Sequence, residues 1–191
     1  MMYYLGRGVL QDYAEAVKWF RLSADQGNVS AQANLGVMYF RGTGVKQDFK
    51  EAVKWLTQAS DKGNATAQLT LGEMSQLGKG VKQDFKEAAR WFRLASDQGH
   101  PLAQARLGTL YYLGQGIPQD LVQAHMWLNL AASRGVKVSI QLRDVVTKRM
   151  TQEQIAKAQE LAKTWKPAPA SQEPQKRVPP SLTNPEKDVP I

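Results

Sequence analysis

The sequence contains no cysteine and only two histidines among its 191 residues. The absence of cysteine excludes disulfide bonds, thiolate metal sites and cysteine nucleophiles. No run of about 18 apolar residues occurs, so no transmembrane helix is expected. No dense block of lysine and arginine occurs either, although the net charge is +8. Because such a block is typical of a nucleic-acid-binding arm, we expect no nucleic-acid partner.

The positive charge is spread along the chain. Residues 1–135 carry 15 Lys and Arg against 11 Asp and Glu, and residues 136–191 carry 10 against 6. A basic balance of this kind favours acidic partners. The first eight residues lack the basic and long apolar segments of a signal peptide. The chain as written therefore indicates the cytoplasm, whereas a longer exported parent would place it in the periplasm, and the localisation stays open.

A repeat of 36 residues runs through the sequence. A shift by this length superimposes a glycine, an aspartate, an alanine, a tryptophan and a second glycine in every copy. In the second copy these residues are Gly44, Asp48, Ala52, Trp55 and Gly63. The tryptophans of the four copies are Trp19, Trp55, Trp91 and Trp127.

The spacing predicts two helices in each copy. The repeated aspartate stands three residues before a Glu or Gln, which resembles a capping box at the start of the first helix. Apolar residues then follow on a wide face, and a glycine such as Gly63 ends the helix in the left-handed conformation. The second helix is expected to begin after Asn28, Asn64 or His100. It is expected to stop at Gly42, Gly78 or Gly114.

A glycine also lies inside each second helix, at Gly36, Gly72 and Gly108. An interior glycine costs about 1 kcal/mol relative to alanine, so its recurrence indicates a close approach to the neighbouring helix, next to the repeated tryptophan. The tryptophans are predicted to be core residues rather than a stacking platform for a ligand. The repeated glutamines are predicted to bond to loop backbone: Gln32, Gln68 and Gln104.

The pattern G-x-G-V-x-Q-D-x-x-x-A-x-x-W, followed by A-Q-x-x-L-G, resembles the Sel1-like repeat family, which is related to the tetratricopeptide repeats. The resemblance covers residues 3 to about 165. It implies an all-α fold, a right-handed solenoid of 36-residue helix-turn-helix repeats with a C-terminal helical cap and a disordered tail. Two departures are Ser75 in place of tyrosine, and a fourth copy in which Ser139 and Asp144 replace alanine and glycine.

Four regions are predicted. Residues 1–8 match the end of a repeat and indicate the remnant of a preceding one, residues 9–136 hold about 3.5 repeats, residues 137–165 form capping helices, and the proline-rich residues 166–191 form a disordered tail. A first helix without its preceding partner would expose apolar surface. The chain is therefore expected to be a fragment of a longer protein, monomeric or weakly self-associating through its N-terminal end.

No catalytic or metal-binding pattern is evident in the sequence. The glycine pairs before the first helices lack the strand, the third glycine and the Lys-Ser/Thr pair of a phosphate-binding loop. His100 stands at a helix-cap position, and His125 occupies the position that Val17 holds in the first copy. Neither histidine therefore predicts a metal ligand or a catalytic base, and we expect no enzyme activity, no metal and no cofactor.

The first helices carry positions spaced i, i+4 and i+7 that share one face. The resemblance implies that these helices line the concave side of the array. The predicted partner-binding residues are basic in three copies and apolar in the fourth: Lys18, Arg21, Lys50, Lys54, Lys86, Arg90, Arg93, Val122 and Met126. The simpler interpretation is a solvated lysine face. The sharper hypothesis is an acidic or phosphorylated peptide lying in the groove, with an apolar anchor at Val122 and Met126.

The resemblance implies a non-catalytic scaffold or adaptor that binds another protein or peptide, a role common in bacterial members of the family. The alternative is a cell-envelope enzyme or small-ligand binder related to peptidoglycan or β-lactams. A cysteine-rich secreted branch of the family has been linked to β-lactams. Its repeated cysteine pairs are absent here, so that activity is not carried over.

Overall fold

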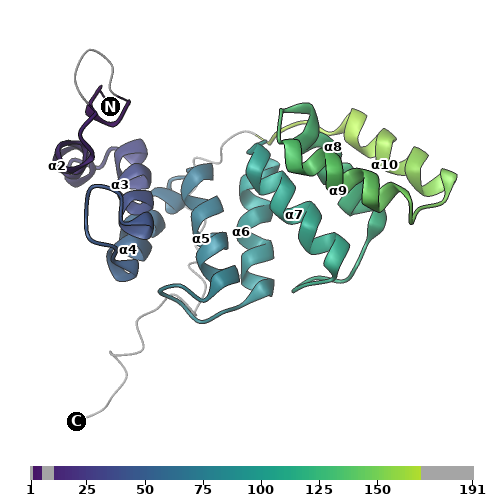
Figure 1. Cartoon of the computed structure of the whole chain (residues 1–191), viewed down its shortest axis with the longest axis horizontal. Helices are drawn as coiled ribbons and strands as arrows, with labels where there is room; N and C mark the ends of the chain where they lie inside the picture. Colours follow the sequence, from purple (N-terminus) through teal and green to yellow (C-terminus); the bar gives the residue numbers. More distant parts are fainter. Residues whose placement is uncertain (1, 6–10, 169–191) are drawn as a thin grey trace, which may run out of the picture.

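The protein is an array of helices stacked side by side (Figure 1). A computed structural model describes residues 2–5 and 11–168, and every regular element within them is helical. The region predicted over residues 1–8 lies partly outside the described residues, and the tail predicted over residues 166–191 lies almost wholly outside them. The elements are α1 (Met2–Leu5), α2 (Tyr13–Asp25), α3 (Val29–Arg41), α4 (Phe49–Asp61), α5 (Ala65–Leu77), α6 (Phe85–Asp97), α7 (Pro101–Leu113), α8 (Leu121–Ser133), α9 (Lys137–Thr147) and α10 (Gln152–Thr164).

Helices α2, α4, α6 and α8 are the first helices of the four repeats, and each begins at the repeated aspartate. The Asp48 carboxylate accepts the backbone N–H groups of Lys50 and Glu51 at 2.9 and 3.0 Å. These are donors that the helix itself leaves unpaired. The same cap is formed by Asp12, Asp84 and Asp120.

A capping box also requires the Glu or Gln three residues after the aspartate to accept the backbone N–H of that aspartate. This part of the prediction is wrong for these first helices. The backbone N–H of Asp48 donates instead to the carbonyl of Tyr39 in the preceding second helix, at 3.0 Å. Glu51, which would have bonded that N–H, accepts the indole N–H of Trp55 at 3.0 Å. The aspartate therefore starts one helix and ties it to the end of the helix before it.

Each second helix packs most extensively against the first helix of the following repeat, and the interior glycine lies at that contact. A Cβ atom at Gly72 would lie 2.5 and 2.6 Å from two ring carbons of Phe92. Gly36 and Gly108 meet Leu56 and Leu128 in the same way. Each of these partners directly follows a repeated tryptophan, so the predicted close approach is confirmed.

Polar contacts also join neighbouring repeats near the ends of the first helices. Lys62 Nζ donates to the carbonyl of Gly27 at 3.0 Å, and Arg134, two repeats further on, donates to the carbonyl of Gly99. The repeated glutamines were predicted to bond to loop backbone, and this is wrong. The amide of Gln32 donates to the Ala24 carbonyl inside α2 at 3.2 Å, and that of Gln104 donates to the Ser96 carbonyl inside α6 at 3.4 Å. The side-chain oxygen of Gln68 accepts from the amide of Gln98 at 2.8 Å.

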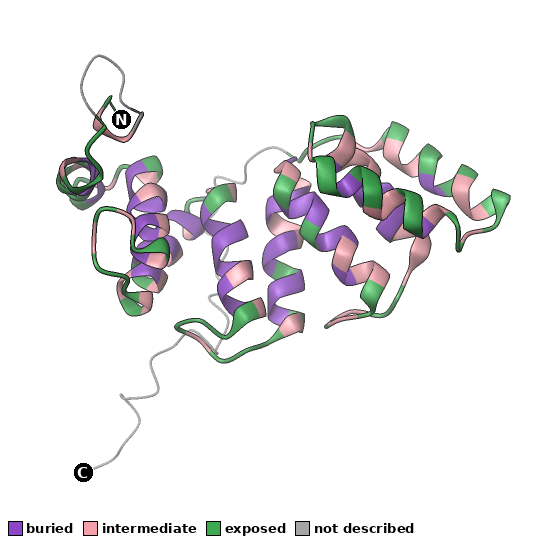
Figure 2. Ribbon diagram, in the orientation of Figure 1, coloured by how far each residue is buried: buried purple, intermediate pink, exposed green. Residues whose placement is uncertain are grey.

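The core runs along the array between the helices (Figure 2). Trp55, Trp91 and Trp127 are 5%, 4% and 2% exposed. Trp91 belongs to the buried cluster of repeats one and two, whereas its neighbour Phe92 belongs to the cluster of repeats three and four. Each buried tryptophan is therefore part of the seam with the preceding repeat.

The prediction of a core tryptophan is wrong at Trp19, which is 55% exposed. Leu22 on the same helix is also 55% exposed. Among the described residues only the four-residue α1 precedes α2, so no preceding first helix lies over this indole. The tryptophan is thus a core residue only where a full repeat stands before it.

The last two helices end the stack in a different way. Helices were expected over residues 138–150 and from Thr151 to about Trp165, and α9 and α10 occupy these places. In α9 the glycine position is taken by the exposed Asp144, whose side chain leaves no room for the close approach of another first helix. Helix α10, which starts with a complete capping box at Thr151 and Gln154, packs extensively against α8 rather than α9.

Within the described residues, no helix is both long enough and apolar enough to cross a membrane.

The substitution Gly72→Ala tests the close approach of neighbouring repeats. Alanine gains about 1 kcal/mol in helix propensity. Its Cβ, however, would overlap the ring of the fully buried Phe92, and overpacking of this kind costs roughly 1–3 kcal/mol. We expect urea unfolding to show a net loss of up to about 2 kcal/mol. Thr66→Ala, at an exposed site on the same helix, should stay within about 0.5 kcal/mol. A Gly72→Ala protein more stable than the wild type would contradict the packing argument.

A second test concerns the start of α7. Asn28 and Asn64 cap α3 and α5 by accepting a backbone N–H at 2.9 Å, whereas His100 forms no side-chain cap bond at the equivalent position. His100→Asn should therefore stabilise the protein by about 1 kcal/mol in urea unfolding. The reciprocal change Asn64→His should cost about as much. An unchanged midpoint for both variants would show that the cap side chain contributes nothing here.

Candidate protein-binding surface

One exposed face runs along the first helices of repeats one to three, and we call it the first-helix face. The aspartate caps fix where each helix begins, so residues at equal distances from the cap point the same way. The face consists of Ala14, Lys18, Arg21, Lys50, Lys54, Thr57, Lys86, Arg90 and Arg93. Most of these residues are exposed, while Thr57 and Arg93 are half-buried. All seven basic residues that the sequence assigned to partner binding are therefore exposed or half-buried at equivalent positions of three successive first helices.

Part of this positive charge is neutralised within each helix. Lys18 pairs with Glu15 at 3.0 Å, Lys54 with Glu51 at 3.4 Å, and Arg90 with Glu87 at 3.2 Å. The basic members are 50–73% exposed, and pairs at such positions contribute little to stability. Their main effect is to lower the charge that a partner would meet.

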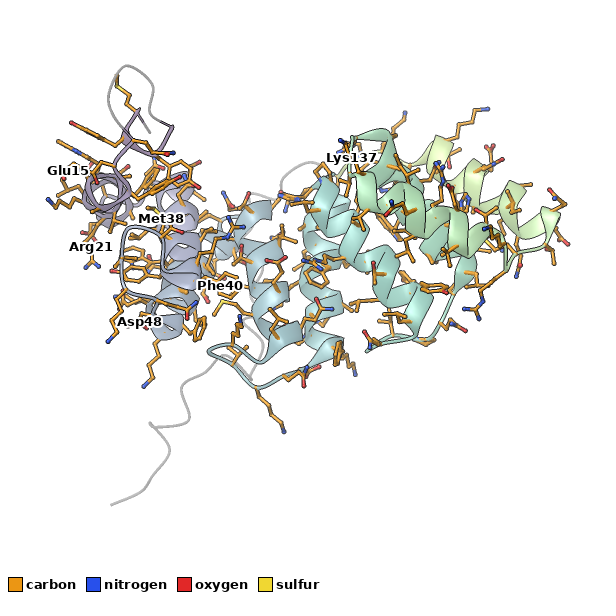
Figure 3. All side chains as sticks on the ribbon, in the orientation of Figure 1. Glu15, Arg21, Met38, Phe40, Asp48 and Lys137 are labelled. Atoms are coloured by element: carbon orange, nitrogen blue, oxygen red, sulfur yellow. The ribbon has the colours of Figure 1, made fainter. Side chains whose placement is uncertain are left out.

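Two arginines of the face are held differently. Arg21 donates to the hydroxyl of Tyr39, and its guanidinium lies over the same ring, 5.7 Å from the centroid. Arg93 donates to the hydroxyl of Tyr111 and lies over both Tyr111 and Trp127, at 5.4 and 5.3 Å. A guanidinium placed on an aromatic face is favoured electrostatically and keeps its charge. Figure 3 shows Arg21 projecting from α2.

Repeat two has neither the arginine nor the tyrosine of this pair. Thr57 takes the place of the arginine, and Ser75 takes the place of the tyrosine. Ser75 is 1% exposed. The arginine–tyrosine pair is therefore present in repeats one and three, whereas repeat two has small polar residues at these two positions and keeps Lys50 and Lys54 on the face.

In the sequence, Ser75 was recognised only as a departure from the family pattern, and the arginine–tyrosine pairs were not predicted. The signal was present within the single chain, because the two positions stand 18 residues apart and change together: Arg21 with Tyr39, Thr57 with Ser75, and Arg93 with Tyr111.

In repeat four the same face is covered, and the prediction that Met126 is exposed is wrong. Met126 occupies the position of Lys18, Lys54 and Arg90 but is only 5% exposed. It belongs to a cluster that includes Leu161, Ala162 and Trp165 of α10 and its end. Val122, the other predicted anchor, is half-buried on α8, the helix against which α10 packs. Met126 therefore packs with the protein's own last helix.

The end of α10 is fixed by three contacts. The indole of Trp165 meets Trp127 edge-on at 6.0 Å between centroids, and Arg134 lies over Trp165 at 5.4 Å. The backbone N–H of Ala168 then donates to the carbonyl of Asp97, at the end of α6, at 2.7 Å. The chain thus passes from repeat four onto repeat three as it leaves α10.

The histidines do not form a reactive site with other groups. His125 is buried in α8, and its pKa lies below the ordinary value because burial disfavours the charged ring and Arg143 repels it, while Asp144 acts in the opposite direction. Burial also lowers the pKa of His100, at the start of α7. Within the described ranges no three side chains among His, Cys, Asp and Glu are grouped to hold a metal ion.

Comparison with known proteins finds the Sel1 repeat family model in four consecutive stretches, residues 1–28, 29–64, 65–100 and 101–136. Each of the last three stretches contains a second helix and the first helix of the following repeat. These are the two helices that pack most extensively against each other. A search of the curated proteins finds no match.

Solved structures similar to this chain include the following two. One is a protective antigen present in uropathogenic Escherichia coli strains and displaying an SLR fold, with 38% identity and a TM-score of 0.80. That match covers 86% of this chain and 35% of the antigen, so this chain spans about a third of the antigen's length. The other is a Sel1 repeat protein from Oxalobacter formigenes, with 32% identity and a TM-score of 0.72, covering 83% of this chain and 69% of that one.

The lowered pKa of His125 gives a prediction about stability and pH. The folded protein binds a proton at this ring less readily than the unfolded chain does. Stability is therefore full above the ordinary pKa of 6.5 and falls as the pH drops through that value. His125→Val, which installs the residue of repeats one and two, should reduce this loss in urea unfolding between pH 7.5 and 5. Glu87 and Asp97, whose pKa values burial raises, act in the opposite direction in both proteins and cancel in the comparison. Identical pH profiles for the two proteins would contradict the assignment to His125.

Proposed function

The chain belongs to the Sel1 repeat family, and we propose that it is a binding scaffold for an acidic segment of another protein, held on the first-helix face of repeats one to three. Sel1 repeat proteins generally mediate protein–protein interactions, and their fold is typically a non-catalytic scaffold. The proposal adds to this general role a particular face and the charge of its partner.

The observation that carries the proposal is the position of α10. This helix lies on α8 in repeat four, over the place that corresponds to the exposed basic residues of repeats one to three. The protein itself thus provides an example of a polypeptide segment packed on this side of the array. In repeats one to three the same side has no covering helix among the described residues, and it is lined by lysine and arginine rather than by Val122 and Met126.

Charge supports an acidic partner. The face carries seven basic residues against the three glutamates that pair within it. Electrostatic complementarity of this kind accelerates association and selects among partners more than it adds to affinity. The interaction should consequently weaken as the salt concentration rises, because the charges are exposed.

Affinity capture with matched baits tests the face. The bait is the full chain, used beside Lys54→Glu/Arg90→Glu, which reverses two exposed charges on α4 and α6. The control is Lys46→Glu/Lys82→Glu, which makes the same charge change in repeats two and three but at exposed loop positions just before α4 and α6 rather than on the helices. We expect a partner retained by the wild type and the control to be lost by the first variant, a loss of tenfold or more (about 1.4 kcal/mol).

Direct titration of the captured protein against the three baits then completes the measurement. Equal affinity for all three would show that the partner binds elsewhere. Equal weakening by both variants would show that only the net charge matters, and it would also contradict the proposed face. Matching thermal melts of the three baits establish that folding is unchanged.

A further inference from the structure

Four of the seven basic residues of the first-helix face have no ion pair in the described structure, and two of these four, Arg21 and Arg93, are held by aromatic neighbours. Lys18, Lys54 and Arg90 each have a glutamate of their own helix within 4.0 Å. Across residues 2–5 and 11–168, Arg21 and Arg93 have no carboxylate within that distance. Their fixed neighbours are tyrosine hydroxyls and aromatic rings, which hold the guanidinium without cancelling its charge.

These arginines are prepared for a carboxylate. A guanidinium has five N–H donors in a rigid plane, and the bond to the tyrosine hydroxyl uses the N–H side of one nitrogen. The remaining edge matches the two oxygens of a carboxylate, and such bidentate pairs are among the strongest hydrogen bonds in proteins. Because the tyrosine already restricts the arginine, less side-chain entropy is lost when a ligand binds.

Lys50 and Lys86 are also unpaired in the described structure, but nothing holds them. Both are exposed in the first turn of their helices, and no side-chain contact of either ammonium is present among the described residues. A flexible, hydrated ammonium contributes to the general field rather than to a defined contact. Asp97, on the same helix as Arg93, feels its charge, since Arg93 lowers the Asp97 pKa against the larger opposite effect of burial. The two groups nevertheless form no ion pair.

The two arginines stand two repeats apart, and the repeat between them carries Thr57 and the buried Ser75 instead. We propose that the partner segment carries two carboxylate side chains, one bound by Arg21 and one by Arg93, separated by a neutral stretch that crosses α4 at Thr57. This assignment rests on the proposed use of the first-helix face and states which groups of that face recognise the partner.

Defined peptides test the assignment without a known partner. The probes are fluorescein-labelled peptides with two glutamates joined by a neutral Ser/Ala linker that is lengthened one residue at a time. Each residue adds about 3.3 Å when extended, so the series scans the separation of the two sites. Fluorescence anisotropy at low ionic strength gives the affinity for the full chain. We expect a maximum at one linker length, with tighter binding there than for the matching single-glutamate peptide.

Substitutions identify the residues responsible. Arg21→Gln and Arg93→Gln should each weaken the best probe about tenfold or more and should abolish its advantage over the single-glutamate peptide. Arg21→Lys should also weaken it, because lysine keeps the charge but not the bidentate edge. Lys46→Gln removes the same charge from an exposed loop side chain outside the first-helix face and should change the affinity by about twofold or less.

Each contrary result has a definite meaning. Three results would each overturn the two-carboxylate assignment: binding that does not depend on linker length, equal weakening by Lys46→Gln and Arg21→Gln, or no binding of any two-glutamate probe to the wild type. The proposed function is judged separately by the capture experiment. A partner lost by Lys54→Glu/Arg90→Glu but kept by the loop control would still support the face. If no captured partner discriminates between those baits, the face itself is wrong.

Discussion

The stacking of successive repeats depends on three positions that carry no side chain. At Gly36, Gly72 and Gly108 the second helix comes so close to the next first helix that a Cβ atom would overlap a fully buried leucine or phenylalanine. The other contacts between neighbouring repeats depend on this close approach of the two helices. The tryptophan before each of these residues is buried in the seam with the preceding repeat, and the cap aspartate bonds back to the preceding helix. A single repeat therefore completes neither its core nor its hydrogen bonds alone, as is general for solenoids.

The same contact explains how the array ends. Asp144 stands where the close-approach glycine would be, and α10 turns back to α8 instead of continuing the stack. This arrangement uses Met126, which stands where the other first helices carry Lys18, Lys54 and Arg90. In repeat four this surface is apolar and is covered by α10. In repeats one to three the equivalent surface is basic, and we assign it to a partner.

Much of this architecture could be predicted from the sequence, because the same helix start and stop signals recur in several copies of the repeat. The helix starts at aspartate, the glycine stops and the close approach of Gly72 all rest on residues within one repeat or its neighbour. Three features could not be predicted in this way. The exposure of Trp19 and the burial of Met126 depend on what lies beyond the repeat itself, and the partner of the Asp48 N–H depends on the helix before it. The arginine–tyrosine pairs could have been predicted from the sequence, but only by comparing two repeat positions together.

The alternation between neighbouring repeats affects how such an array can change in length. Odd repeats carry the arginine–tyrosine pair, and even repeats carry the basic side chain that reaches the glycine carbonyl of the repeat before, Lys62 or Arg134. The structural unit is therefore a pair of repeats. Loss or duplication of one repeat would place two guanidinium sites side by side, or two reaching side chains in succession, and would shift every later position on the first-helix face. Gain or loss of two repeats would preserve both patterns, so the array can be lengthened evenly only by doublets.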